Sequence, residues 1–187
     1  MGFSLGKLTK KWPQAQSIGL EMSPIAAEEA KKIDGAEIHH LSFQQAVHEQ
    51  LWEIEQVDII TMNHVVEHWN NFEREIVNLI KIQKKNVTLT YVEFPGIDSL
   101  KLGRRDADVL GDIYVPHMYY FTSYVFEDIM QRHGFEKVYL DSEIRGIFRY
   151  TGSIKKEIKN NFLAVKNDLL EAEKKRLKFN ILSKIRQ

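Results

Sequence analysis

The stretch Ile18-Gly19-Leu20-Glu21-Met22-Ser23-Pro24 decides the fold, because an apolar run, an acid and the start of a helix follow one another directly. Ser23 belongs to the residue types preferred as N-caps, and Pro24 to those favoured at the first helical position. We therefore expect a strand over 16–21 and a helix that begins at Pro24 and ends before Asp34-Gly35. A strand that leads straight into a helix is the first half of a βαβ unit.

The rest of the chain up to residue 150 alternates between apolar runs and helical periodicities, which is typical of an α/β fold. The uninterrupted apolar run Val57 to Met62 predicts a central strand that is covered on both faces. Two further runs, Glu136–Leu140 and Gly146–Tyr150, predict an antiparallel strand pair joined by a tight turn. The remaining helices are expected over 3–12, 43–52, 72–83 and 123–132, and the remaining strands over 36–41 and 87–94. A long polar loop over 97–118 is of the kind that often covers a substrate.

The composition fits one globular domain, with 187 residues of which 43% are hydrophobic and 28% are charged. The absence of cysteine excludes disulfides and thiolate chemistry, and it fits a reducing compartment, so we expect a cytoplasmic protein. No stretch approaches the roughly 18 apolar residues that a membrane-spanning helix needs, and the first residues carry no apolar run typical of a signal peptide.

The zero net charge hides an asymmetry between the body of the chain and its end. From Thr151 onward there are ten Lys/Arg and four Asp/Glu, a net charge of +6, whereas the preceding 150 residues hold 16 and 22, a net charge of −6. An acidic body disfavours nucleic acid as a partner. We predict an α/β domain over 1–152 and a basic amphipathic helical tail over 153–187. Such a tail can pack on its own domain, form a homodimer or lie on a membrane surface.

Glu21 stands at the carboxyl tip of an early strand, where nucleotide-binding α/β domains hold the two hydroxyls of a ribose. The glycine-rich turn that accompanies such an acid is expected about twenty residues upstream, and Gly2 stands where that turn should end. We therefore expect that the sequence begins inside its cofactor loop and lacks the first strand of the sheet.

Four stretches support a family resemblance through their order and spacing. They are Gly19 to Pro24, Val57 to His68, Val92 to Pro95, and His117 to Thr122 with the following Gly134-Phe135. The chain resembles class I S-adenosylmethionine-dependent methyltransferases, particularly the methyltransferase 23 group. The resemblance implies a Rossmann-like doubly wound sheet, N-terminally truncated, with a C-terminal antiparallel strand pair and a helical tail. It also implies that S-adenosylmethionine is the cofactor.

The same resemblance implies where the cofactor would bind. The residues expected to contact it are Gly2, Phe3, Glu21, Met22, Asn63 and His64. Glu21 would accept hydrogen bonds from the ribose, and Met22 would lie against the adenine. The family usually places an acid near the adenine at the third strand. Because this chain has His39, His40 and Ser42 there, the adenine contact stays open.

Methyl transfer from a sulfonium is an in-line displacement, so the protein contributes mainly positioning and, for a hydroxyl acceptor, a base. Histidine is the natural base near neutral pH, and His68 and His117 are the candidates. Glu67, Tyr119 and Tyr120 are expected to line the pocket of a small-molecule acceptor that is polar, such as a sugar or a surface-glycan precursor.

Two alternatives to an active methyltransferase stay open. The stretch His64-Val65-Val66-Glu67-His68 satisfies H-x-x-E-H, the zinc signature of inverted metalloproteases. That motif belongs inside a helix, whereas here it directly follows an apolar strand, so we expect no metal site. The second alternative is a non-catalytic methyltransferase remnant that acts by binding a partner. The missing first strand favours the remnant, and the intact downstream motifs favour the enzyme.

Overall fold

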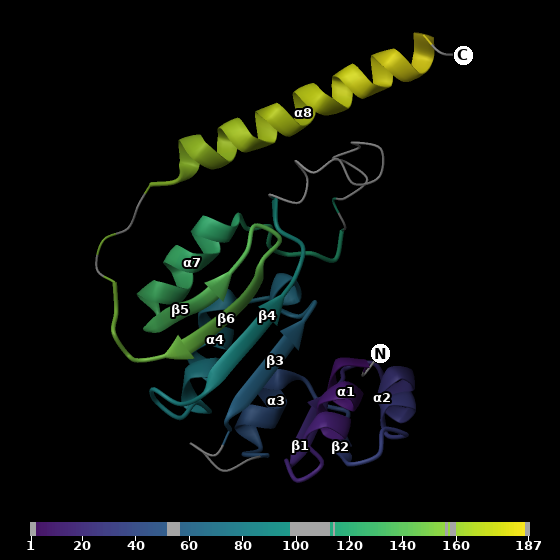
Figure 1. The fold of residues 1–187 in the computed structure, drawn as a ribbon, viewed down its shortest axis with the longest axis vertical. Helices are drawn as coiled ribbons and strands as arrows, with labels where there is room; N and C mark the ends of the chain where they lie inside the picture. Colours follow the sequence, from purple (N-terminus) through teal and green to yellow (C-terminus); the bar gives the residue numbers. More distant parts are fainter. Residues whose placement is uncertain are drawn as a thin grey trace. The chain divides into compact units, whose positions relative to one another are not determined.

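The structure is a computed structural model that describes residues 3–51, 57–97, 113, 115–155, 157 and 160–185. Gly2 and most of the predicted loop over 97–118 lie outside these described residues. The chain forms two compact units, Met1–Glu53 and Ile54–Gln187 (Figure 1). The boundary that we expect between residues 152 and 153 is a different division, and it stays a prediction.

The described residues of the first unit form two short parallel strands and three helices. Its strands are β1 (Ser17–Leu20) and β2 (Ala36–His39), with Ser17 opposite Ala36 and Leu20 opposite His39. Its helices are α1 (Phe3–Lys11), α2 (Pro24–Ala30) and α3 (Phe43–His48). The element order that the sequence predicts for this part of the chain is confirmed.

The ends of α2 and α3 show how local chemistry sets their length. Ser23 caps α2, since its hydroxyl accepts a 3.4 Å hydrogen bond from the N–H of Ala26. Ser42 and Gln45 form a reciprocal capping box at the start of α3. Both helices are shorter than predicted. The chain leaves α3 at Gln50, which has a left-handed φ of 52° although it is not a glycine.

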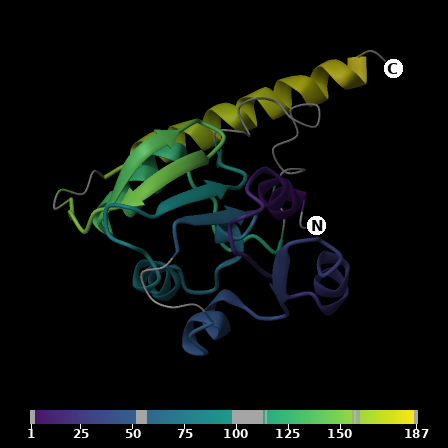
Figure 2. The ribbon, with the colours of Figure 1, turned by 60° about the horizontal axis from the view of Figure 1, so that its bottom comes forward.

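The second unit contains a four-stranded mixed sheet in the order β3-β4-β6-β5 (Figure 2). Its strands are β3 (Ile59–Asn63), β4 (Leu89–Glu93), β5 (Phe135–Leu140) and β6 (Arg145–Tyr150). The helices among its described residues are the 3-10 helix η1 (Val66–His68), α4 (Phe72–Lys81), α7 (Ser123–Arg132) and α8 (Phe162–Ile185). β3 runs parallel to β4, and β6 runs antiparallel to both β4 and β5. The predicted C-terminal antiparallel pair is therefore confirmed.

The prediction that Val57 to Met62 forms a central strand covered on both faces is wrong. β3 pairs with β4 along one edge, and the described residues place no strand along its other edge. The side chain of Ile59 is 51% exposed, and Met62 is the one residue of β3 that is buried. An apolar run reveals a tendency to be buried, but it does not reveal which neighbouring strands are present to bury it.

An aromatic core fills the space between α7 and the sheet of the second unit. Phe126 of α7 packs edge-on against Phe94, with ring centroids 5.0 Å apart, and against Phe148 of β6 at 5.7 Å. All three side chains are at most 1% exposed. Gly134 ends α7 in the left-handed conformation with φ 85°, as the sequence predicts.

The helical tail predicted over 153–187 is confirmed in part, since α8 begins at Phe162 and the described residues between 153 and 161 are not helical. Part of α8 packs on the rest of the second unit. Ala172 is buried against Ile97, with Val165 and Tyr120 packed beside the pair. Phe162 nevertheless remains 65% exposed. A homodimer or membrane contact through this helix stays a prediction. Among the described residues, no helix is both long enough and apolar enough to cross a membrane.

Candidate functional site

The candidate site of the second unit is built where β3 and β4 end. The two strands are parallel with Asn63 opposite Glu93, so their carboxyl ends meet at one edge of the sheet, the usual position of ligand sites in α/β folds. The Glu93 carboxylate accepts a 3.2 Å hydrogen bond from the Asn63 amide and a 2.7 Å hydrogen bond from the Tyr91 hydroxyl. The main-chain N–H of His64 donates to the carbonyl of Glu93 at 2.7 Å. The first turn beyond β3 is thereby fixed to the end of β4.

His64 turns the chain sharply out of β3. Its φ of 52° is left-handed, and η1 follows within two residues. This turn brings Glu67 fully inside the protein, with 0% of its side chain exposed. One oxygen, Oε1, lies 3.1 Å from His64 Nδ1 and 4.0 Å from His68 Nε2. The other oxygen, Oε2, is buried and has no hydrogen-bond partner in the described structure.

A second segment, residues 115–122, returns to η1 and completes the site. The N–H groups of Met118 and Tyr119 both donate to the main-chain carbonyl of Glu67, at 2.7 and 3.3 Å. His68 Nδ1 lies 3.1 Å from the carbonyl oxygen of Pro116. These contacts place the His117 ring edge-on to the His68 ring, with centroids 4.9 Å apart.

The pKa of His117 is lower than that of an ordinary surface histidine. Burial lowers the pKa of His117, and the negative charge of Glu67 acts in the opposite direction. An imidazole with a lowered pKa is neutral near pH 7, and a neutral ring can accept a proton or hold a cation. The negative charge of Glu67 can stabilise a protonated imidazole or a cation that is bound at His117.

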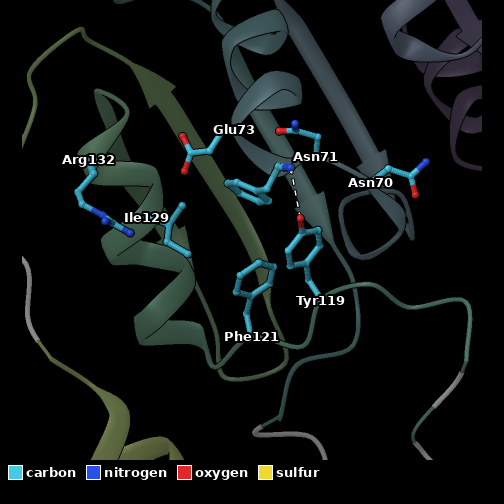
Figure 3. A pocket seen from close by; sticks show the side chains of 8 residues that line it. Asn70, Asn71, Glu73, Tyr119, Phe121, Ile129 and Arg132 are labelled. Carbon is cyan, nitrogen blue, oxygen red and sulfur yellow. Dashed lines mark hydrogen bonds between the residues drawn. The ribbon is translucent and has the colours of Figure 1, made fainter.

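The predicted pocket residues Tyr119 and Tyr120 point to different surroundings. The Tyr119 ring lines a hollow of about 430 Å³ with Phe121, Ile129 and Arg132, between the start of α4 and α7 (Figure 3). The Tyr120 ring lies beside His117, with centroids 5.5 Å apart, and packs against the contact of Ile97 with Ala172. The structure therefore brings Tyr120, His64, Glu67, His68 and His117 together by side-chain contact, while the Tyr119 side chain faces the neighbouring hollow.

In the first unit, Glu21 and Met22 follow the end of β1. The Glu21 carboxylate accepts a 2.9 Å hydrogen bond from the N–H of Ser23. Met22 is 71% exposed, and its carbonyl oxygen lies 2.9 Å from His40 Nε2. Of the three residues considered at the end of β2, His39 lies beside Glu37, Ser42 caps α3, and His40 contacts this turn. Phe3 begins α1.

Three groups of the site were missed by reasoning from the sequence. They are the Tyr91 hydroxyl, the Glu93 carboxylate and the Pro116 carbonyl. Glu93 could have been found, because it lies near the end of the strand predicted over 87–94, as Asn63 directly follows the strand predicted over 57–62, and parallel strands end at the same edge. The Pro116 carbonyl could not be predicted. Every residue has a main-chain carbonyl, so the sequence does not indicate which one contacts His68 from 48 residues away.

The geometry of the H-x-x-E-H stretch departs from the zinc-protease arrangement. His64 lies outside η1 with a left-handed φ, and Glu67 and His68 lie within a 3-10 helix of three residues. The two histidines therefore do not share one face of an α-helix, which that arrangement requires.

A protein-family model described as a methyltransferase domain (Methyltransf_23) matches residues 5–140 of the chain. No curated protein sequence gives a significant match. Among solved structures, the plantazolicin methyltransferase BamL, in complex with a triazolic desmethylPZN analog and SAH, is 18% identical with a TM-score of 0.59. That match covers 95% of this chain and 66% of BamL.

Two other solved structures are similar in fold. The N,N-8-amino-8-demethyl-D-riboflavin dimethyltransferase RosA from Streptomyces davawensis is 16% identical with a TM-score of 0.57, over 79% of this chain and 46% of RosA. A SAM-dependent methyltransferase from Thermotoga maritima is 21% identical with a TM-score of 0.50, over 76% of this chain and 70% of that one. This chain thus spans less than two thirds of the length of BamL and RosA.

Proposed function

We propose that this chain, which belongs to the methyltransferase domain family Methyltransf_23, binds S-adenosylmethionine and transfers its methyl group to a small polar acceptor. The observation that carries the proposal is the cluster of Glu67, His68 and His117 at the carboxyl end of β3, within or beside elements that the family match includes. The SAH bound to BamL, the demethylated form of the cofactor, supports the choice of cofactor.

The cofactor contacts that we propose fit the chemistry of the strand ends. The hydrogen bond from the N–H of Ser23 uses one lone-pair site of Glu21 Oε1, and a carboxylate offers about four such sites, so it can accept from both ribose hydroxyls. Met22 offers an exposed apolar side chain for the adenine face. In the second unit, Asn63 and His64 are proposed to contact the methionine end of the cofactor. Gly2 and Phe3 complete the proposed set.

When bound, S-adenosylmethionine supplies an electrophilic methyl group on a sulfonium. The residues of this chain then have to orient the acceptor hydroxyl and remove its proton as the new O–C bond forms and the C–S bond breaks. We propose that His117 accepts this proton, because its lowered pKa keeps the ring neutral. Glu67 would stabilise the resulting imidazolium, as a carboxylate does in hydrolase triads. His68, with Nδ1 facing the Pro116 carbonyl, is the second candidate base.

The acceptor that we propose is a sugar or a surface-glycan precursor, because the methyltransferase 23 resemblance includes enzymes of that kind. The polar cluster of imidazoles and a carboxylate supports an acceptor with hydroxyl groups, which can donate hydrogen bonds to these side chains. A panel of hydroxylated sugars, nucleotide sugars and aromatic amines, assayed for transfer of labelled methyl, separates this choice from an amine acceptor.

Calorimetric titration of S-adenosylhomocysteine into the chain tests the cofactor assignment. We expect saturable binding that Glu21→Ala weakens at least tenfold, since the ribose would lose a charged acceptor. The matched control is Glu28→Ala, because Glu28 is an exposed acid of α2 that pairs with Lys31, and we expect unchanged affinity. No binding by the folded parent chain, or equal effects of the two substitutions, would refute the assignment.

A further inference from the structure

The hydrogen bonds of the buried Glu67 side chain do not fully compensate the negative charge of its carboxylate. Its carboxylate is fully buried, and Oε2 has no hydrogen-bond partner among the residues that the structure describes. Burial of a carboxylate is strongly unfavourable unless hydrogen bonds or an opposite charge compensate for the lost hydration. The natural solution is a positive charge that binds the unpartnered oxygen.

His68 is oriented as a metal-binding histidine usually is. Its Nδ1 faces the Pro116 carbonyl at 3.1 Å, and because a carbonyl oxygen only accepts, Nδ1 carries the proton. In the neutral ring the lone pair then belongs to Nε2, which lies 4.0 Å from Glu67 Oε1. Metal-ligating histidines typically donate their other N–H to a carbonyl or carboxylate, and this contact fixes the tautomer and the ring orientation.

His117 brings a third donor to the same place. One potential ligand atom from each of Glu67, His68 and His117 lies within 4.8 Å of the other two. Ligand atoms around a tetrahedral zinc ion are about 3.4 Å apart, given metal–ligand distances near 2.1 Å. The hydrogen bonds from Met118 and Tyr119 to the Glu67 carbonyl hold the two backbone segments together, so this difference would be closed by rotation of the two imidazole rings.

We propose that Glu67, His68 and His117 form a binding site for one divalent first-row transition-metal ion. Two imidazoles and one carboxylate match Zn²⁺ and Co²⁺ better than Mg²⁺, which prefers oxygen ligands. Three protein ligands leave at least one coordination position for water or another oxygen ligand. This site differs from the H-x-x-E-H arrangement, since its second histidine is His117, while His64 lies 3.1 Å from Glu67 Oε1 and orients the carboxylate.

The inference does not depend on the proposed methyl transfer. A bound ion and a proton on His117 are alternative uses of the same donors, and metal binding is measured with neither cofactor nor acceptor present. Failure of methyl transfer therefore leaves the metal site standing, and failure of metal binding leaves the cofactor assignment standing.

Titration of Zn²⁺ into the full chain, after removal of adventitious metal with a chelator, tests the site. We expect one Zn²⁺ per chain by calorimetry, a rise in the melting temperature, and visible absorption of bound Co²⁺ typical of four- or five-coordination. Glu67→Gln and His117→Asn should each weaken Zn²⁺ binding about 100-fold or more, because each removes a ligand. His64→Asn should weaken it about tenfold, as expected for a residue that orients a ligand.

His48→Asn is the matched control, since His48 is an exposed histidine at the end of α3 in the first unit. We expect it to leave Zn²⁺ affinity unchanged. Circular dichroism checks that each variant is folded, and His117→Asn keeps the test decisive if Glu67→Gln does not fold. Absence of Zn²⁺ binding by the parent chain, affinity that survives in His117→Asn, or equal affinity for Mg²⁺ would each overturn the proposal.

Discussion

The hydroxyl of Tyr119 accepts a 3.4 Å hydrogen bond from the main-chain N–H of Phe72, the first residue of α4 (Figure 3). The first N–H groups of an α-helix have no partner within the helix. Asn71 caps a second of these N–H groups, since its side-chain oxygen accepts a 3.0 Å hydrogen bond from the N–H of Arg74. Tyr119 therefore stabilises the start of α4, in addition to lining the hollow beside it.

Replacing Tyr119 by Phe should lower the free energy of unfolding by about 0.5–1 kcal/mol, because a long hydrogen bond is lost while the ring remains. Asn71→Ala should cost about 1 kcal/mol through loss of the N-cap. Urea denaturation measures both. Tyr139→Phe is the control, since Tyr139 is an exposed residue of β5, and its effect should be near zero. An equal loss in the control would contradict the helix-start role.

The turn between β5 and β6 should make stability depend on acid pH. Asp141 accepts hydrogen bonds from the N–H of Arg145 at 2.9 Å and from its guanidinium at 2.7 Å. Burial raises the pKa of Asp141, but these bonds outweigh it and hold the pKa below its usual 3.8. The stabilisation is thus present above pH 3.8 and is lost as the pH falls through the lowered pKa.

Asp141→Asn should therefore lower the free energy of unfolding at pH 7 by about 1–2 kcal/mol and flatten its dependence on pH below 4. Urea denaturation between pH 2.5 and 7 shows both effects. Asp58→Asn serves as the control, because the Asp58 side chain is 73% exposed in its ion pair with Lys84. A parent chain whose acid dependence equals that of Asp141→Asn would refute this assignment.

The strand-end network should hold the proton of Tyr91 at high pH. Burial and the hydrogen bond to Glu93 raise the pKa of Tyr91 to about 12. Because the folded-state pKa lies above the usual value near 10, this stabilisation is present below pH 10 and is lost as the pH rises towards 12. Glu93→Gln should lower the pKa of Tyr91, as measured by NMR titration of the tyrosine ring carbons. An unchanged titration would contradict the contact between the two side chains.

Two glycines should respond in opposite ways to an added methyl group. Gly134 has a φ of 85°, and a Cβ there would lie 3.0 Å from Gly152 Cα, so Gly134→Ala should cost about 1–3 kcal/mol. A Cβ on Gly6 of α1 would meet Ile33 at an ordinary 3.5 Å, so Gly6→Ala should be neutral or stabilising by up to about 1 kcal/mol. Urea denaturation compares the two variants. Equal losses in the free energy of unfolding would contradict the different backbone conformations of the two glycines.

Residues that act through local chemistry were predictable from the sequence. The start of α2 at Ser23-Pro24 and the end of α7 at Gly134 are confirmed, because a cap or a left-handed glycine involves only a few neighbouring residues. The antiparallel pair of β5 and β6 is confirmed for a similar reason, since a short turn between two strands leaves one way to pair them.

The environment of β3 and the contacts of the site were harder to predict, because both depend on residues distant in the sequence. The exposure of Ile59 follows from which strands pair with β3, and the strand itself does not encode this. His68 and His117 were each singled out by chemistry, yet their contact depends on main-chain hydrogen bonds to Glu67. Their catalytic role stays a prediction.

The position of β6 between β4 and β5 has a consequence for how the second unit opens. Phe148 is paired on both sides, opposite Thr90 of β4 and Lys137 of β5, and its ring is fully buried. Each main-chain N–H of β6 points towards one of these two strands, and neither edge of β6 is open to solvent, so the protection factors of its amides should report the global unfolding of this unit. The amides of β3, which has a neighbour along one edge, should exchange through smaller local openings.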